Sequence, residues 1–226
     1  MKKILAFTLA ETLIVMGVIG IVSALTLPNL NSSTGDKERV AKVKKIYQNL
    51  NDALGRAEAV YGPYEEWFIN DTTDQAKAKR VGERLVEFMK VSKDCSNTTN
   101  QKCMNNNYDT NDKFYKVILA DGTSFATAGP VNSNQIFVDI DGPAKGSGSS
   151  GKDFFVFIFS DDGVIPSGYK ESFADLIQDC RDLGKYPATW IIKYDNADYL
   201  QFQSVSGSTA TCKNGNTVTE ANPRCK

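Results

Sequence analysis

The stretch AFTLAETLIVMGVIGIVSALTLPNL, residues 6–30, decides how the rest of the chain is interpreted. No charged residue occurs from Thr12 to Leu30, which are 19 residues and span roughly 28 Å as a helix at ~1.5 Å per residue. Lys2 and Lys3 precede the stretch, and Glu11 stands near its start. Such a segment is typical of a cleaved signal peptide, of a single-span anchor, or of a retained segment used in assembly.

A secretory signal peptide is the first alternative. Val22-Ser23-Ala24 offers a small-residue cleavage site before Leu25. Cleavage near Ala24 would release a secreted or membrane-anchored periplasmic binding domain. Glu11 argues against this interpretation, because a charge at the start of the apolar region of a signal peptide is unfavourable.

A single-span anchor is the second alternative. The third, a retained segment used in assembly, accounts for every feature of the N-terminus. Met1-Lys2-Lys3-Ile4-Leu5-Ala6 form a short basic leader that ends in a small residue, and Phe7-Thr8-Leu9-Ala10-Glu11 follow it. This pattern resembles the processing motif of the type IV pilins and type II secretion pseudopilins. The likeness covers about the first thirty residues and departs from the usual pattern at Ala6, where Gly is commoner.

The resemblance implies a structural subunit rather than an enzyme. A prepilin peptidase would cleave between Ala6 and Phe7, and Phe7 would be N-methylated. The subunit would be held in the bacterial inner membrane by one span, with its head in the periplasm or outside the cell as part of a filament. The implied partners are homologous pilin subunits, the peptidase and N-methyltransferase, and an inner-membrane assembly platform.

The same resemblance gives Glu11 and Pro28 roles in assembly. An unpaired carboxylate in hydrocarbon costs a few kcal/mol or more. We therefore expect Glu11 to pair with the new amino group of Phe7 on a neighbouring subunit and to set the axial register of the filament. Pro28 stands where pilins carry a proline that loosens the helix, and the polar residues after it favour a kink or a break.

The expected fold is α+β and pilin-like, with a long N-terminal helix packed on a head that contains an antiparallel β-sheet. Apolar residues recur at spacings of three and four from Val40 to Tyr61, and Gly62-Pro63 ends that pattern. The expected parts are a leader over 1–6, a transmembrane and filament-core helix over 7–30, an amphipathic second half over 31–61, and a globular head over 62–226.

Within the head, the pattern predicts a helix over 75–90 and a change to strands from Lys113. Asp121-Gly122 lies between two apolar runs and predicts a β-hairpin. The runs QIFVDID and DFFVFIFSDDG predict two further strands. A short amphipathic helix is expected over 171–183, and a strand or a strand–helix pair over 189–202.

The composition excludes several classes of function. The chain has no histidine, which removes His-dependent triads and His-ligated zinc sites. A net charge of −1 gives no indication of a nucleic-acid partner. The five basic residues between Lys37 and Lys45 are interpreted as a solvated face next to a membrane. Paired carboxylates leave a hydrolase as a minor alternative, because no catalytic geometry can be read from sequence.

Five cysteines behind a targeting segment are disulfide candidates. Their spacing favours the pairs Cys95–Cys103 and Cys212–Cys225, with Cys180 left unpaired. Asp139 and Asp141 alternate in a loop and form a minor candidate for calcium, but the further ligands of an EF-hand are absent. An ordinary turn is the preferred interpretation, and no cofactor is expected.

Overall fold

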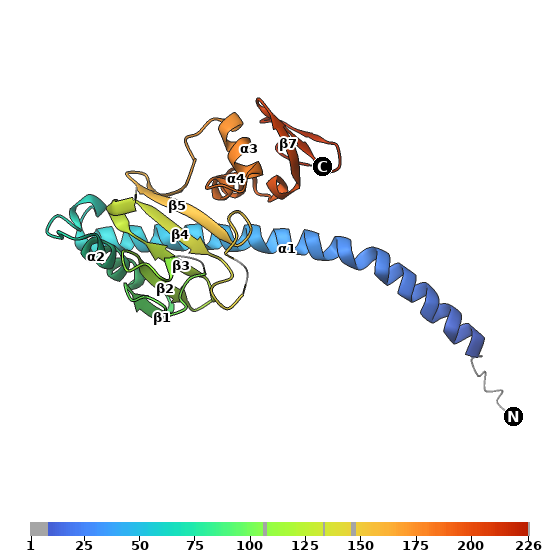
Figure 1. The fold of residues 1–226 in the computed structure, drawn as a ribbon, viewed down its shortest axis with the longest axis horizontal. Coiled ribbons are helices and arrows are strands. Elements are labelled where there is room, and N and C mark those ends of the chain that lie inside the picture. Colours follow the sequence, from blue (N-terminus) through green and yellow to red (C-terminus); the bar gives the residue numbers. More distant parts are fainter. Residues whose placement is uncertain (1–8, 106–107, 133, 146–147, 226) are drawn as a thin grey trace. The chain divides into compact units, whose positions relative to one another are not determined.

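The structure is a computed structural model that describes residues 9–105, 108–132, 134–145 and 148–225. The chain divides into two compact units, residues 1–38 and 39–226. Helix α1 (Leu9–Tyr61) begins in the first unit and ends in the second (Figure 1). The second unit contains every other helix and strand that the structure describes.

The second half of α1 buries one face in the core of the head. The buried side chains follow the spacing of three and four expected of an amphipathic helix, and they are Val43, Ile46, Leu50, Ala53, Leu54 and Ala57. The helix ends at Gly62, whose φ of 81° lies in the left-handed region and whose N–H donates to Glu58 O at 2.9 Å. Pro63 then prevents the helix from continuing.

The larger sheet is antiparallel, and its strands follow one another in chain order. Its members are β1 (Val91–Ser96), β2 (Tyr115–Leu119), β3 (Ser124–Thr127), β4 (Gln135–Asp139), β5 (Phe154–Ser160) and β6 (Gly163–Pro166). The Asp121-Gly122 turn joins β2 to β3, with Val117 opposite Phe125. Short connections of this kind suit antiparallel neighbours.

Two short 3₁₀ helices and α2 flank the larger sheet. They are η1 (Tyr64–Glu66), η3 (Gly129–Asn132) and α2 (Asp74–Val86). The Thr73 side chain accepts the N–H of Ala76 and so caps α2. A Cβ at Gly82 would lie 2.1 Å from the Tyr115 ring. Glycine therefore lets α2 approach β2 closely.

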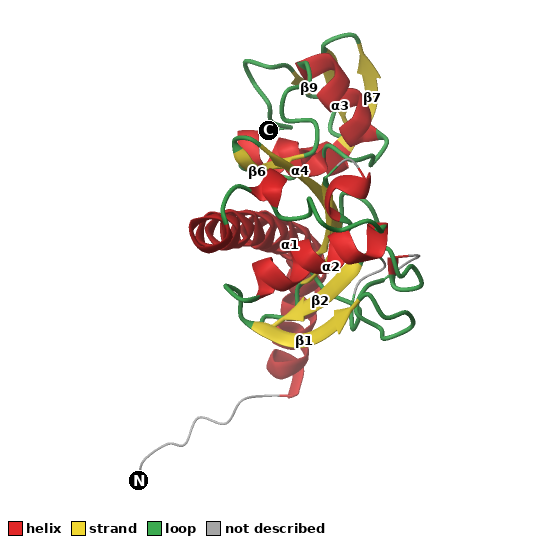
Figure 2. Ribbon diagram, turned by 90° about the vertical axis from the view of Figure 1, so that its left-hand side faces the viewer, coloured by secondary structure: helices red, strands yellow, loops and turns green. Residues whose placement is uncertain are grey.

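The C-terminal part of the chain adds helices and a smaller antiparallel sheet, seen in Figure 2 around the labels α3, α4 and β7. Its elements are α3 (Phe173–Arg181), α4 (Pro187–Tyr194), η4 (Asp198–Gln201), β7 (Phe202–Ser206), β8 (Thr209–Cys212) and β9 (Thr217–Val218). Trp190 is fully buried and meets Phe202 edge-on, with ring centroids 5.2 Å apart. Aromatic packing therefore joins α4 to the smaller sheet.

The expected pilin-like fold with a membrane-spanning half is wrong. Among the residues that the structure describes, no helix combines the length and the apolar character needed to cross a membrane. The expected transmembrane helix and the single-pass location in a bacterial inner membrane are overturned with it.

Three details of the expected fold are also wrong. The head contains two antiparallel sheets where one was expected. Helix α1 continues through Pro28, so a break of the helix there is wrong. The segment expected to begin a strand near Trp190 is helical in α4, and the strand β7 follows it.

Candidate functional site

The first turns of α1 expose an apolar surface. Large side chains between Leu9 and Val22 retain 54–79% of their accessible area, and they are Leu9, Leu13, Ile14, Val15, Met16, Val18, Ile19, Ile21 and Val22. We call Leu9–Val22 the N-terminal apolar segment. Successive residues of a helix are rotated by about 100°, so the run Leu13–Met16 already covers its whole circumference. A helix that is apolar on every side is normally surrounded by other apolar groups.

Along the sequence, Ala6 and Phe7 precede this segment, Glu11 falls within it, and Pro28 follows it. Ala6 and Phe7 are outside the residues that the structure describes. Glu11 and Pro28 belong to α1, but their side chains are likewise outside the description. Their proposed roles therefore rest on the sequence pattern.

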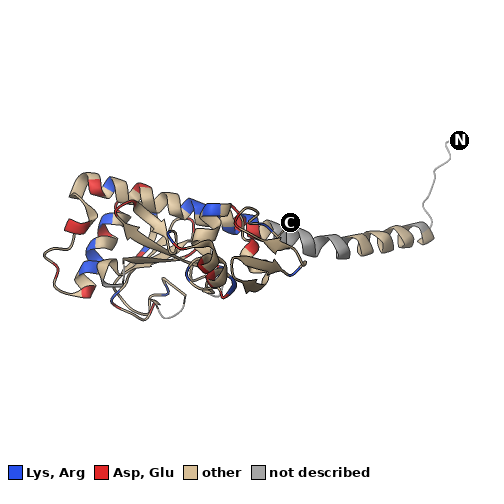
Figure 3. Ribbon diagram, turned by 90° about the horizontal axis from the view of Figure 1, so that it is seen from above, with Lys and Arg blue, Asp and Glu red and all other residues tan. Residues whose placement is uncertain are grey.

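Several basic residues of α1 form ion pairs with the head. Figure 3 shows them (blue) on the half of α1 that enters the head. Three lysines each reach an aspartate of a different loop: Lys42 to Asp141 at 2.5 Å, Lys44 to Asp195 at 2.7 Å, and Lys45 to Asp121 at 2.6 Å. Each pair is partly exposed and contributes about 0–1 kcal/mol. The sequence led us to expect that these three lysines only face solvent, whereas each forms an ion pair with the head.

The carboxylates of the two calcium candidates, Asp139 and Asp141, already bind groups of the protein. Asp139 Oδ1 accepts the N–H groups of Asp141 at 3.2 Å and Gly142 at 2.9 Å, while Oδ2 accepts the Asn105 amide at 3.0 Å. The Asp141 carboxylate pairs with Lys42 instead. Within the described ranges, no group of three or more Asp, Glu, Cys or His residues is placed to hold a metal ion. The arrangement is a capped turn.

Burial dominates the electrostatics of Asp139. Its side chain is 0% exposed, and desolvation raises the pKa of its carboxyl group to about 6. The N–H donors of Asp141 and Asn105 work in the opposite direction and lower this pKa. Asn105 also donates to the carbonyls of Gly142 and Lys145, each at 3.1 Å. One amide group therefore ties the β4–β5 loop to the loop between β1 and β2.

The structure contains two disulfides, Cys95–Cys103 and Cys212–Cys225. These are the two pairs that the spacing favoured. Cys180 is a free cysteine inside α3, and burial raises the pKa of its thiol well above the ordinary value. A protonated, buried thiol is a poor nucleophile, so Cys180 acts as a small core residue.

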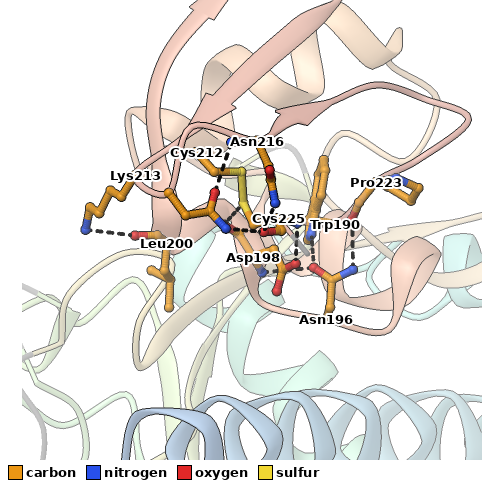
Figure 4. Close-up of a disulfide and its surroundings, with 10 residues drawn as sticks. Trp190, Asn196, Asp198, Leu200, Cys212, Lys213, Asn216, Pro223 and Cys225 are labelled. Carbon is orange, nitrogen blue, oxygen red and sulfur yellow. Dashed lines mark hydrogen bonds between the residues drawn. A yellow bond between two sulfur atoms is a disulfide. The ribbon is translucent and has the colours of Figure 1, made fainter. Parts of the chain in front are cut away.

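The second disulfide belongs to a network that fixes the C-terminal end of the described chain (Figure 4). The N–H of Cys225 donates to Asp198 Oδ2 at 2.7 Å, and the Asn216 amide donates to Cys225 O at 3.1 Å. The Asn196 amide donates to Pro223 O at 3.1 Å, and its oxygen accepts Trp190 Nε1–H at 2.8 Å. Hydrogen bonds and the disulfide together hold this end against α4 and η4.

A pocket of about 340 Å³ lies where η1 meets the turn between β5 and β6. Tyr64 and Phe159 line it together with the acidic residues of both segments. No local sequence pattern predicts this pocket, because Tyr64 and Phe159 in its wall are about 95 positions apart. One local feature of the sequence does point to this region. The run Tyr64-Glu65-Glu66-Trp67-Phe68, directly after Gly62-Pro63, mixes aromatic and acidic side chains.

A comparison with protein families identifies one relationship. The model of a family of unknown function, DUF6613, matches residues 30–173, more than half of the chain. The chain belongs to the DUF6613 family. No curated protein and no solved structure matches it. The DUF6613 match contains all of the larger sheet and ends where α3 begins, so α4 and the smaller sheet lie beyond it. Nothing in these comparisons points to pilins or pseudopilins.

Proposed function

We propose that this chain is a structural subunit that assembles with copies of itself, or with related chains, through the N-terminal apolar segment. The observation that carries this proposal is the exposure of apolar side chains on every side of α1 between Leu9 and Val22. Several neighbouring helices around each copy would cover such a surface. The head, in contrast, buries its own apolar residues in a core of its own.

The energetic scale supports assembly. Burying one Val, Leu, Ile or Met side chain contributes about 1.5–3 kcal/mol. The exposed members of the segment together therefore offer more than ~10 kcal/mol. Association costs an estimated 4–15 kcal/mol in translational and rotational freedom, and about 0.5–1.5 kcal/mol more for each side chain that becomes ordered. Because each copy would be surrounded by several others, the gain accumulates over more than one contact.

The proposal includes processing at the N-terminus. The motif at Ala6 and Phe7 supports cleavage between these residues and methylation of the new amino group. Glu11 would then pair with the Phe7 amino group of an adjacent copy, which would offset the desolvation of both charges and fix the register. The two disulfides are typical of proteins in an oxidising compartment, so we place the head outside the cytoplasm.

Mass spectrometry of the mature chain tests the processing step. We expect an N-terminus at methylated Phe7. An N-terminus at Leu25 would remove the apolar segment and would instead support a secreted binding domain.

Substitution of Glu11 tests the pairing step. We expect Glu11→Ala to leave the folded head intact and to lower the yield of assembled filaments at least about tenfold, a difference of roughly 1.4 kcal/mol per contact. Glu38→Ala, on the same helix but outside the segment, is the matched control and should assemble normally. Equal filament yield from both variants would contradict the pairing.

A further inference from the structure

The pocket beside η1 has an aromatic wall. Tyr64 stacks on Phe159 with ring centroids 4.5 Å apart and an interplanar angle of 23°. Phe68 meets Tyr64 edge-on at 5.3 Å and 74°. All three residues line the pocket, and both Tyr64 and Phe159 are buried. The wall is therefore a rigid apolar surface.

Asn134 fixes this wall. Its side-chain oxygen accepts the Tyr64 hydroxyl at 3.2 Å, and its backbone carbonyl accepts the Phe159 N–H at 2.9 Å. The φ of Asn134 is 57°, a left-handed conformation that Asn adopts more readily than most residues. Segments far apart in sequence are thus held in one arrangement, and this arrangement is part of the region shared with the DUF6613 family.

The remaining charged side chains around the pocket are mostly acidic. They are Glu65, Asp161 and Asp162, and Lys170 is the one basic residue in the described lining. Three carboxylates against one ammonium leave a formal charge of −2. Lys170 lies 3.7 Å from Asp162 with both side chains about three-quarters exposed, which makes a weak pair. Burial raises the pKa of Tyr64, and the charge of Glu65 raises it further.

We propose that this aromatic and acidic pocket binds an ammonium or guanidinium group carried on an aliphatic stem. The stem would pack on Tyr64, Phe68 and Phe159, as the stems of Lys and Arg pack on apolar surfaces. The charged end would meet the carboxylates of Glu65, Asp161 and Asp162. An anion is repelled, and a neutral ligand leaves the carboxylates partly desolvated without a partner. The inference holds for a single copy and does not depend on assembly.

Small probes test the chemistry directly. The ¹⁵N-labelled full chain, kept dispersed in nonionic detergent micelles, would be titrated with n-butylammonium, methylguanidinium, n-butanol and butyrate. We expect the two cations alone to shift the amide signals of Asn134 and Gly163, and the shifts to weaken several-fold in high salt. Equal shifts with n-butanol, or binding that salt does not change, would overturn the proposal.

Charge-neutral variants supply the control. The combination Glu65→Gln, Asp161→Asn and Asp162→Asn keeps the shape of the pocket, and should weaken cation binding at least about tenfold. The combination Asp52→Asn, Glu83→Gln and Asp182→Asn removes the same formal charge elsewhere and should bind as the wild type does. Wild-type affinity in the first variant would overturn the proposal.

Two further ligands identify the source of the cation. Nα-Acetyl-lysine amide, which keeps its ε-ammonium group, represents a side chain of a partner protein, and putrescine represents a free polyamine. Tighter binding of one names the natural source, while failure of both to bind would overturn the proposal.

Discussion

Asn51 of α1 completes the free edge of the larger sheet. Its side-chain oxygen accepts the N–H of Val164 at 3.0 Å, and its amide donates to Val164 O at 3.0 Å. The same amide donates to Tyr47 O at 3.1 Å. Since β6 is the last strand of the sheet, one side chain provides the hydrogen bonds that another strand would make. This also protects the edge from pairing with other chains.

Replacing Asn51 should therefore be costly. Asn51→Ala leaves the buried N–H and C=O of Val164 without partners, and we expect the free energy of unfolding to fall by about 2 kcal/mol or more. Urea denaturation followed by circular dichroism measures the loss. Asn49→Ala, at an exposed position of the same helix, should change the free energy by less than about 0.5 kcal/mol. Similar values for both variants would contradict this role of Asn51.

Asp139 gives stability a pH dependence of unusual sign. Its pKa is about 6 in the folded chain against an ordinary value of 3.8, so the folded state binds the proton more tightly than the unfolded state does. Its contribution is fully present below pH 3.8 and is lost as the pH rises through 6. Burial alone would raise the pKa of the Asp121 carboxyl group, but the hydrogen bonds from Lys45 and Thr123 outweigh it and lower this pKa. The stabilisation from Asp121 is therefore present above pH 3.8 and is lost only as the pH falls below that value.

The free energy of unfolding between pH 4 and pH 6 tests this assignment. We expect the contribution of Asp139 to decline across that range, and Asp139→Asn to remove this decline. Urea titrations of both chains at half-unit steps provide the comparison. A decline of the same size in Asp139→Asn would assign the effect to another group.

At the scale of elements, local chemistry made some features predictable. The spacing of apolar residues predicted the buried face of α1, and Asp121-Gly122 predicted the β2–β3 hairpin, because both signals lie within a few residues. Helix α4 was missed because Trp190, Ile191 and Tyr194 favour strands by local propensity. The left-handed conformation of Asp195, with a φ of 55°, ends that helix and has no clear signal in the sequence.

Long-range pairs were beyond local patterns. Lys44 and Asp195 are 151 positions apart, and Lys45 and Asp121 are 76 apart. Only the folded topology brings them together. The same holds for the aromatic pocket, whereas the disulfide pairs follow from short separations of 8 and 13 residues.

The disulfide Cys212–Cys225 should stabilise the smaller sheet selectively. A closed loop of 13 residues contributes about 3 kcal/mol in the chain-entropy account. The double variant Cys212→Ala and Cys225→Ala should increase hydrogen exchange of β8 amides by about a hundredfold or more, while β3 and β4 stay protected. Cys180→Ala is the control that keeps both disulfides. Uniform loss of protection in β3 and β8 would show that the two sheets unfold together.

For the whole molecule, the contrast between the two ends of α1 is the central feature. Residues from Val43 to Ala57 bury their apolar face in the head, whereas Leu9 to Val22 expose apolar side chains in all directions. The sequence predicted an apolar N-terminal segment, and the membrane span inferred from it is wrong for the described chain. A structural subunit that assembles through this segment accounts for the exposed surface.

Sedimentation and negative-stain electron microscopy after detergent removal test this claim most directly. The wild-type chain should form ordered polymers, and so should the control Val60→Lys with Ile69→Lys, which charges two exposed apolar positions of the head. Ile14→Lys with Val18→Lys places charges in the N-terminal apolar segment, and this variant should remain unassembled with its head folded. Polymers of this variant in wild-type amount would contradict the proposed assembly.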